Sequence, residues 1–299
     1  MKLIFKYLIL FIITPGAYAL TYPLDNSTEV FGKVFTVTPQ TNDTFSDYAR
    51  MYNVGAVALQ RANPGIDENY PDKQLDDITI PAEFVLPSKR DGIVINLPEL
   101  RVYYFMPSQV ATYPVSIGRV GWETPVRETS VIGKEKNPSW NIPKSIQAEN
   151  RAKGINLPAV VPPGPNNPLG KYAIRLGISG YLLHGTNAPA SIGRRVSHGC
   201  IRLFPDDIEE LYPSVPIGTP VSLINEPIKA GWRDNKLYLQ VYPLLQEYPM
   251  SETTRQELAK NVINNAKSNK SIKIDWDLVD KAMREKSGIP EMIGNNRLL

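Results

Sequence analysis

The chain of 299 residues carries 33 Lys and Arg against 30 Asp and Glu, and 42% of its side chains are apolar. Its length is typical of roughly two domains, and a charged share of 21% excludes a charge-rich disordered tail and a coiled coil. The net charge of +3 is too small for a nucleic-acid surface, so we expect no nucleic-acid partner. The 27 prolines favour strands and turns over long helices, which predicts a mostly β fold.

Residues 1–19 have the pattern of a signal peptide. Lys2 and Lys6 precede an apolar run at 7–13, and residues 17–19 read Ala-Tyr-Ala, a small-x-small cleavage site. An uncleaved anchor is the alternative, but the apolar run is shorter than the ~20 residues that a bilayer span needs. We therefore expect cleavage after residue 19, export from the cytoplasm, and no transmembrane anchor in the mature chain.

Residues 34–87 are predicted to form a small unit with the order strand, helix, helix, strand. We expect strands at 34–37 and 77–81 and helices at 45–52 and 57–62. A Thr or Asn side chain just before the first helix can cap it, and Asn-Pro-Gly at 63–65 ends the second.

This unit resembles a LysM module, a small βααβ domain. The residues that carry the resemblance are Asn42-Asp43-Thr44-Phe45, Tyr48-Ala49, Tyr52-Asn53-Val54, Leu59, Ala62-Asn63-Pro64 and Ile78-Thr79-Ile80-Pro81. LysM modules bind N-acetylglucosamine polymers, so the resemblance implies that the unit binds cell-wall glycan. On that view, removal of residues 20–87 weakens wall binding and leaves turnover of soluble substrate intact. A βααβ spacer without a ligand is the alternative.

Residues 90–226 form a longer region rich in strand patterns. A hairpin is expected from 92–97 and 101–105. The other expected strands lie at 111–117, 172–176, 181–184 and 220–224, and a short helix at 205–211. The Pro-rich stretch 137–170 is too long for a plain connection, which predicts a lid or a substrate cradle. Together these elements predict a β-sandwich or an open barrel.

Residues 227–299 are richer in helix. We expect a strand at 237–241 and helices at 251–266 and 277–286. This C-terminal α/β extension contains no apparent catalytic group, which indicates a role in packing or interaction.

Both histidines and the single cysteine fall within 17 residues, from His184 to Cys200. A lone cysteine cannot form an internal disulfide, so it is either a reactive thiol or a buried apolar residue. A neighbouring imidazole can take the thiol proton and return it to a leaving amine. His198 shares a face with Cys200 in an extended segment, whereas His184 can approach the sulfur from a second strand.

No Asp or Glu lies between His184 and Phe204, so a backbone carbonyl or a distant residue must orient the base. Arg194, Arg195 and Arg202 suit a substrate with carboxylates. A zinc site would use every soft ligand in the chain and still need another, so we expect no metal. These residues could also have purely structural roles. His198 could be a core residue, the Ser197 hydroxyl could bond the backbone, and Arg194 and Arg195 could be ordinary solvated side chains.

Two motifs carry a resemblance to the L,D-transpeptidase (YkuD) family. They are His184-Gly185 and Ser197-His198-Gly199-Cys200-Ile201-Arg202, and the match extends over residues 92–224. The resemblance implies that Cys200 attacks the bond between diaminopimelate and the terminal D-alanine of a peptidoglycan stem tetrapeptide. His184 would then transfer protons, and His198, Gly199 and the Cys200 amide would bind the oxyanion.

The resemblance further implies that Arg202 holds a substrate carboxylate and that Ser197 and Gly185 also line the substrate site. No metal or cofactor is implied, and the domain order is that of the periplasmic Gram-negative subgroup. The acceptor amine would be a second diaminopimelate, which gives a 3→3 cross-link, or a lysine of an outer-membrane protein. An L,D-carboxypeptidase that uses water, and a wall-binding protein without activity, are the alternatives.

Overall fold

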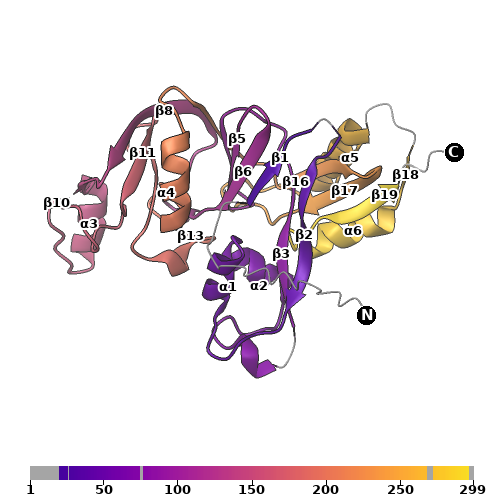
Figure 1. The fold of residues 1–299 in the computed structure, drawn as a ribbon, viewed down its shortest axis with the longest axis horizontal. Helices are drawn as coiled ribbons and strands as arrows, with labels where there is room; N and C mark the ends of the chain where they lie inside the picture. Colours follow the sequence, from indigo (N-terminus) through magenta and orange to yellow (C-terminus); the bar gives the residue numbers. More distant parts are fainter. Residues whose placement is uncertain (1–19, 26, 75–76, 268–271, 296–299) are drawn as a thin grey trace, which may run out of the picture.

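The structure is a computed structural model that describes residues 20–25, 27–74, 77–267 and 272–295. The predicted signal peptide at 1–19 lies outside the described residues. Figure 1 shows a large curved sheet, a small unit below it in indigo and purple, and a C-terminal part in yellow at the right.

A nine-stranded sheet forms the largest part of the fold, in the order β1-β6-β5-β4-β15-β8-β11-β12-β14. The strands are β1 (Leu20–Pro23), β4 (Ile93–Asn96), β5 (Arg101–Phe105), β6 (Gln109–Pro114), β8 (Arg127–Lys136), β11 (Tyr172–Leu176), β12 (Leu182–His184), β14 (Ile201–Arg202) and β15 (Pro220–Ile224). Neighbours are antiparallel except for β4 with β15 and β12 with β14, which are parallel. The predicted hairpin is present as β4 and β5.

The sheet curls until its two sides meet. Ser116 follows β6, and it pairs with Arg202 in β14 through two backbone hydrogen bonds of 2.9 Å. Apolar side chains such as Ile95, Val102 and Leu183 fill the enclosed core and are fully buried. Of the two expected architectures the structure is thus an open barrel and not a sandwich, because a single sheet folds back on itself.

Shorter elements complete the barrel. Residues 137–170 contain β9 (Trp140–Asn141), α3 (Lys144–Ala152) and β10 (Val160–Val161), and β9 pairs with β10. A two-stranded ladder joins β7 (Ile117–Gly118) to β13 (Arg195–Ser197). The helix α4 (Pro205–Ser214) runs three residues beyond its predicted end and packs Ile208 and Leu211 into the barrel core.

The small N-terminal unit has the predicted order, with β2 (Val30–Val37), α1 (Phe45–Met51), α2 (Ala56–Ala62) and β3 (Ile78–Val85). A short 3-10 turn, η1 (Pro71–Gln74), precedes β3. The helix α1 begins where expected because Thr44 and Asp47 form a capping box, each side chain accepting a hydrogen bond from the other's backbone N–H. The strands are longer than expected, since β2 starts at residue 30 and β3 ends at residue 85.

This βααβ unit (residues 30–85) shares its core with the barrel. Ile192 and Phe204, which flank the segment that contains Cys200, lie buried among its apolar side chains. Beside them, Gly193 contacts Gly55 backbone to backbone. The unit is therefore packed onto the barrel and is not an independent domain joined to it only by a linker.

The C-terminal unit (residues 228–295) is an α/β layer. Its strands are β16 (Ile228–Arg233), β17 (Lys236–Val241), β18 (Lys273–Ile274) and β19 (Glu291–Asn295), in the order β16-β17-β19-β18. The helices α5 (Glu252–Lys267) and α6 (Trp276–Glu285) lie within one residue of the predicted bounds. Ile263, Val279 and Met283 pack from these helices onto the sheet and give the unit its own core.

A buried ion pair ties the three parts together. The ammonium of Lys229 donates to the carboxylate of Glu99 at 2.7 Å and to the carbonyl of Val85 at 2.5 Å. Tyr103 and Tyr242 also donate to Glu99, so the buried carboxylate has several partners. A buried charge that lost these partners would be strongly destabilising, which fixes the relative placement of the parts.

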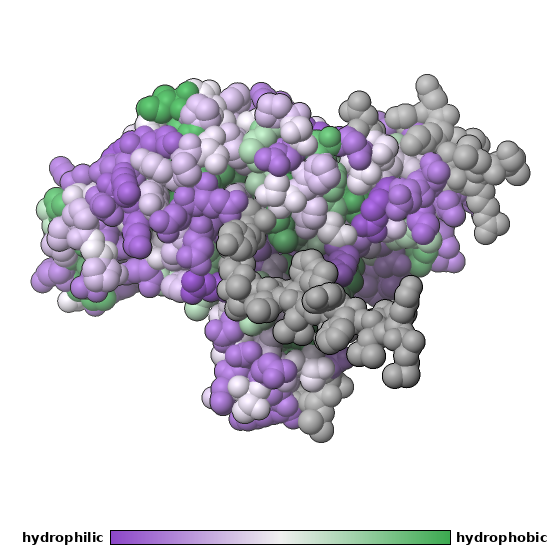
Figure 2. Space-filling view, viewed as in Figure 1, coloured by the Kyte–Doolittle hydropathy of each residue, from purple (hydrophilic) through white to green (hydrophobic). Residues whose placement is uncertain are grey.

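Within the described residues, no helix is both long enough and apolar enough to cross a bilayer. On the face shown in Figure 2, hydrophilic residues cover most of the described surface and hydrophobic ones occupy small separate areas.

Candidate active site

The predicted site residues come together through the parallel pair β12 and β14. Leu183 lies opposite Ile201, and His184 lies opposite Arg202. Leu183 and Ile201 are fully buried in the barrel core. Because side chains alternate along a strand, His184 and Arg202 lie on the other face, and Cys200 shares that face with Arg202.

That face lines a cleft of about 750 Å³. Cys200, His184, His198, Ser197 and Arg202 all line it. The stretch 137–170 supplies part of the opposite wall, through Trp140, Ile146, Asn150 and Leu157 among others. Residues of the predicted lid or cradle therefore border the same space as the thiol.

His184 is buried, with 3% of its surface exposed, and its ring is oriented by the backbone. Its Nδ1 lies 2.6 Å from the carbonyl oxygen of Gly185. Since a carbonyl only accepts, Nδ1 carries the hydrogen and Nε2 keeps its lone pair. Burial, with the positive charge of Arg202 as a second cause, lowers the pKa of His184 to about 4. The ring is therefore neutral near pH 7 and able to accept a proton.

Cys200 is a free, partly exposed thiol. Its Sγ–H donates to the carbonyl of Gly180 at 3.4 Å. Burial raises the pKa of the Cys200 thiol, and the Leu182 N–H and the charge of Arg202 oppose that rise. With His184 neutral as well, the resting pair is a thiol and an imidazole, not a thiolate and an imidazolium.

The turn before Cys200 is held by its own hydrogen bonds. The hydroxyl of Ser197 donates to the carbonyl of Cys200 at 2.5 Å and accepts from the N–H of Gly199 at 3.1 Å. Gly199 has φ +103°, and a Cβ there would meet the Tyr181 ring at 2.9 Å. Its carbonyl accepts from Thr124 Oγ1 at 2.7 Å. The Ser197 hydroxyl therefore hydrogen-bonds to the backbone, which is one of the alternatives that the sequence left open. Gly199 is required both by its positive φ and by the small space beside Tyr181.

The three arginines of the sequence motif have different surroundings. Arg194 pairs with Glu68 at 2.7 Å, and Arg195 binds Glu247 through two nitrogens at 2.8 and 3.0 Å. Neither lines the cleft, in contrast to Arg202. The Nε of Arg202 is buried and has no hydrogen-bond partner among the described residues. Of the three, Arg202 is the cation available to an anionic ligand.

His198 has partners that the sequence did not reveal. Its Nε2 lies 3.0 Å from a carboxylate oxygen of Glu149 in α3, and Trp122 meets its ring edge-on, with centroids 4.7 Å apart. In the sequence, Glu149 lies 49 positions before His198, and Trp122 lies 76 positions before His198. No spacing rule connects residues that far apart in different elements of the fold, so neither partner could be found from the sequence.

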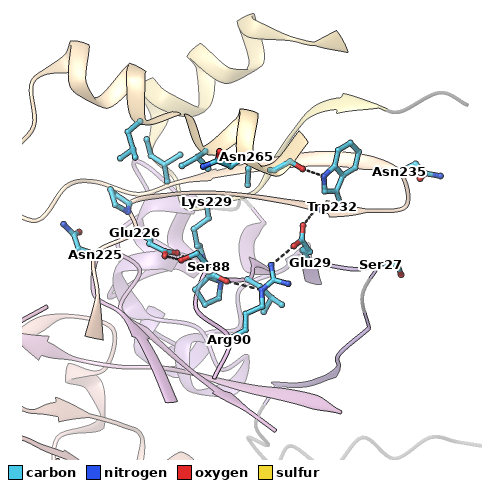
Figure 3. Close-up of a pocket in the computed structure, with 18 residues that line it drawn as sticks. Ser27, Glu29, Ser88, Arg90, Asn225, Glu226, Lys229, Trp232, Asn235 and Asn265 are labelled. Carbon is cyan, nitrogen blue, oxygen red and sulfur yellow. Dashed lines mark hydrogen bonds and ion pairs between the residues drawn. The ribbon is translucent and has the colours of Figure 1, made fainter. Parts of the chain in front are cut away.

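A second cavity of about 720 Å³ lies between the barrel and the C-terminal unit (Figure 3). Its Glu29 accepts from the Arg90 guanidinium at 2.5 Å and from the backbone N–H of Trp232 at 3.1 Å, and Ser88 donates to Glu226. These polar groups pair with one another within the wall, and none of the predicted site residues lines the cavity. In the described ranges, no three His, Cys, Asp or Glu side chains are grouped as ligands of a metal ion.

Comparisons with known proteins agree with the motif. Residues 90–223 match the YkuD family model, described as the L,D-transpeptidase catalytic domain. The chain is 41% identical over 287 residues to the "Probable L,D-transpeptidase YcfS" of Escherichia coli K12, covering 92% of this chain and 88% of that protein. It is 37% identical over 288 residues to the "Probable L,D-transpeptidase YbiS" of the same strain, covering 92% of each. Among solved structures, L,D-transpeptidase 3 from Mycobacterium tuberculosis matches 52% of this chain and 67% of that one, with 20% identity and a TM-score of 0.36.

Proposed function

The chain belongs to the YkuD family of L,D-transpeptidases, and from this premise we propose that it is a cysteine-dependent L,D-transpeptidase of peptidoglycan stem tetrapeptides. One observation carries the proposal. The single thiol of the chain lies just before β14, a buried, neutral imidazole ends its parallel neighbour β12, and both line one cleft. That arrangement suits thiol acyl transfer with the histidine as base and acid.

Acylation begins with Cys200. Its Sγ attacks the carbonyl that joins diaminopimelate to the terminal D-alanine, and His184 Nε2 takes the thiol proton as the C–S bond forms. The backbone N–H of Cys200 would bind the oxyanion of the tetrahedral intermediate. When the C–N bond breaks, His184 returns the proton to the amine, and D-alanine leaves with a thioester remaining on Cys200.

An amine then resolves the thioester. His184 takes a proton from the attacking amine, the new amide forms, and the thiol of Cys200 is restored as the C–S bond breaks. The amine of a second diaminopimelate would give a 3→3 cross-link, and a lysine of an outer-membrane protein would give an anchored protein. Arg202, with its unpartnered Nε, would hold a carboxylate of the stem peptide.

The remaining parts would place this reaction at the cell wall. Residues 1–19 would direct the chain to the periplasm and be removed on export. The unit within residues 34–87 would bind glycan, and its β-α-α-β order supports that assignment as a LysM module. Domain limits of 90–226 for the catalytic part and 227–299 for the extension are compatible with β16 starting at Ile228.

The test is intact-protein mass spectrometry after addition of a carbapenem, with Cys200→Ala beside the wild type. A covalent adduct on the wild type alone is expected, and no adduct on either would overturn the role of Cys200 and favour a wall-binding protein. Incubation with purified tetrapeptide muropeptides then identifies the acceptor. Cross-linked dimers support the transpeptidase, whereas tripeptide without any dimer assigns an L,D-carboxypeptidase.

A further inference from the structure

The carboxylate of Glu149 occupies the centre of a cluster beside the cleft. It accepts from His198 Nε2 at 3.0 Å, from Arg119 at 2.5 Å and from Lys153 at 2.7 Å. Lys153 lies just after α3, and Arg119 just after β7. The cluster thus joins the helix of the predicted lid to the turn that carries His198.

We propose that Glu149 is a positioning residue, which holds His198 in the Nε2–H tautomer and fastens α3 beside the cleft. The proposal rests on the proposed function for its catalytic consequence, but its structural content is independent of it.

The chemistry of the partners dictates the tautomer. The hydrogen bonds from Lys153 and Arg119 lower the pKa of Glu149 to about 2, so this carboxylate is ionised near neutral pH and only accepts. His198 must therefore donate through Nε2. Burial lowers the pKa of His198, and the hydrogen bond to Glu149 opposes that effect. In the neutral ring the hydrogen is on Nε2, and Nδ1 has a lone pair.

The surroundings also fix the plane of the ring. Trp122 meets the imidazole at 79°, and the guanidinium of Arg119 lies 5.6 Å from the Trp122 ring centroid. The charged groups that act on His198 are Glu149 from α3, Arg119 after β7 and Arg202 from β14. Only Glu149 among them is negative. It is the one group that both orients the ring and favours its charged form.

This assignment changes what the His198 side chain can do. A neutral ring whose Nε2–H is bound to Glu149 has no second N–H, so its Nδ1 cannot donate to an oxyanion. The side chain of His198 instead presents an acceptor, which suits an N–H of the substrate. Oxyanion binding then falls to the backbone N–H of Cys200. Family resemblance implies that His198 helps to bind the oxyanion, and this assignment removes its side chain from that role.

The chain offers a direct test, because it has only two histidines. With 15N-labelled histidine, NMR of the full mature chain distinguishes the two neutral tautomers. We expect His198 to show the Nε2–H form and His184 the Nδ1–H form. In Glu149→Gln, the His198 pattern should change and its pKa should fall, while the His184 pattern stays as an internal control of folding. Glu128→Gln removes an ion-paired carboxylate of the main sheet and is the matched control, with both patterns unchanged.

Acylation by a carbapenem gives the second readout. We expect Glu149→Gln to acylate about 10- to 100-fold more slowly, since a displaced catalytic turn costs that much, and Glu149→Asp to recover part of the rate. A wild-type His198 in the Nδ1–H form, or a Glu149→Gln variant with unchanged His198 signals, would overturn the proposal. A wild type that no carbapenem acylates would contradict the proposed function, and the tautomer result would still be read.

Discussion

The contact between the βααβ unit and the barrel can be probed by adding one carbon atom. Gly193 has φ +80°, and a Cβ there would lie 2.4 Å from the Cα of Gly55 and 2.5 Å from the nitrogen of Ala56. Both neighbours are backbone atoms, which cannot rotate away as the end of a side chain can. Gly193→Ala must therefore push the unit off the barrel or distort the segment that leads to Cys200.

Gly65→Ala is the matched control. Gly65 has φ +91°, but among the described residues no heavy atom beyond its own chain neighbours lies within 4 Å of its Cβ position. An alanine there bears only the backbone cost of a positive φ, about 1 kcal/mol. Gly193→Ala bears the same cost and a steric one of about 1–3 kcal/mol, as in overpacked cores. At roughly 2–4 °C per kcal/mol, we expect the control to lower Tm by about 3 °C and Gly193→Ala by about 10 °C.

Thermal unfolding followed by circular dichroism measures the difference, and carbapenem acylation reports the site. Gly193→Ala should acylate more slowly than Gly65→Ala, because Gly193 belongs to the segment between His184 and Cys200. Equal Tm values for the two variants would refute the reasoning, since the added carbon would then meet no resisting backbone.

Three further predictions follow from the same structure. The LysM resemblance alone implies that removal of residues 20–87 leaves turnover of soluble muropeptides intact, but the structure predicts that it abolishes turnover, because it removes β1 from the main sheet and uncovers a shared core; normal turnover by the truncated chain would show the units to be independent. With a His184 pKa of about 4, wild-type acylation should be nearly flat between about pH 6 and 8. The acylation rate of His184→Ala should be about 10²–10⁴-fold lower, and it should rise about tenfold per pH unit, as the thiolate fraction of Cys200 does. A rate independent of pH in this variant would refute the role of His184 as the base. Burial raises the pKa of Asp207 from 3.8 to about 8, so the folded state holds a proton that the unfolded chain loses, and the free energy of unfolding falls as pH rises through this range. Asp207→Asn should remove that decline and stabilise the chain at pH 7 by at least about 1 kcal/mol in urea titrations; an unchanged pH dependence would contradict it.

The sequence predicts elements well where local patterns are strong. The hairpin at β4 and β5, the βααβ order and the helices α5 and α6 follow from apolar periodicity and capping residues. The two-residue strand β14 could not be predicted, because only pairing with β12 and Ser116 makes Ile201 and Arg202 a strand. The sequence does not predict the helix α3 either, since proline signals surround it and its helical stretch is polar, with Ile146 alone buried.

The site shows the same division. The sequence groups His184 with Cys200, because a rare thiol and two rare imidazoles cluster in it, and in the structure both residues line one cleft. The sequence does not decide whether a backbone carbonyl or a distant residue orients His184. In the structure, the carbonyl of Gly185 bonds to its ring. The partner of His198 was beyond prediction. Glu149 contacts it from the helix α3, whose position depends on how the whole stretch 137–170 packs against the barrel.

The arginines next to the motif show why sequence proximity to a nucleophile is a weak guide to role. Arg194 and Arg195 are consecutive, and their side chains bind opposite parts of the molecule. Arg194 binds Glu68 of the βααβ unit, and Arg195 binds Glu247 from the C-terminal region. All four side chains are less than a third exposed, so water weakens these pairs less than it would at a fully exposed surface. The segment between His184 and Cys200 is thereby anchored from both sides, and the placement of the thiol depends on parts of the chain that contribute no atom to the chemistry.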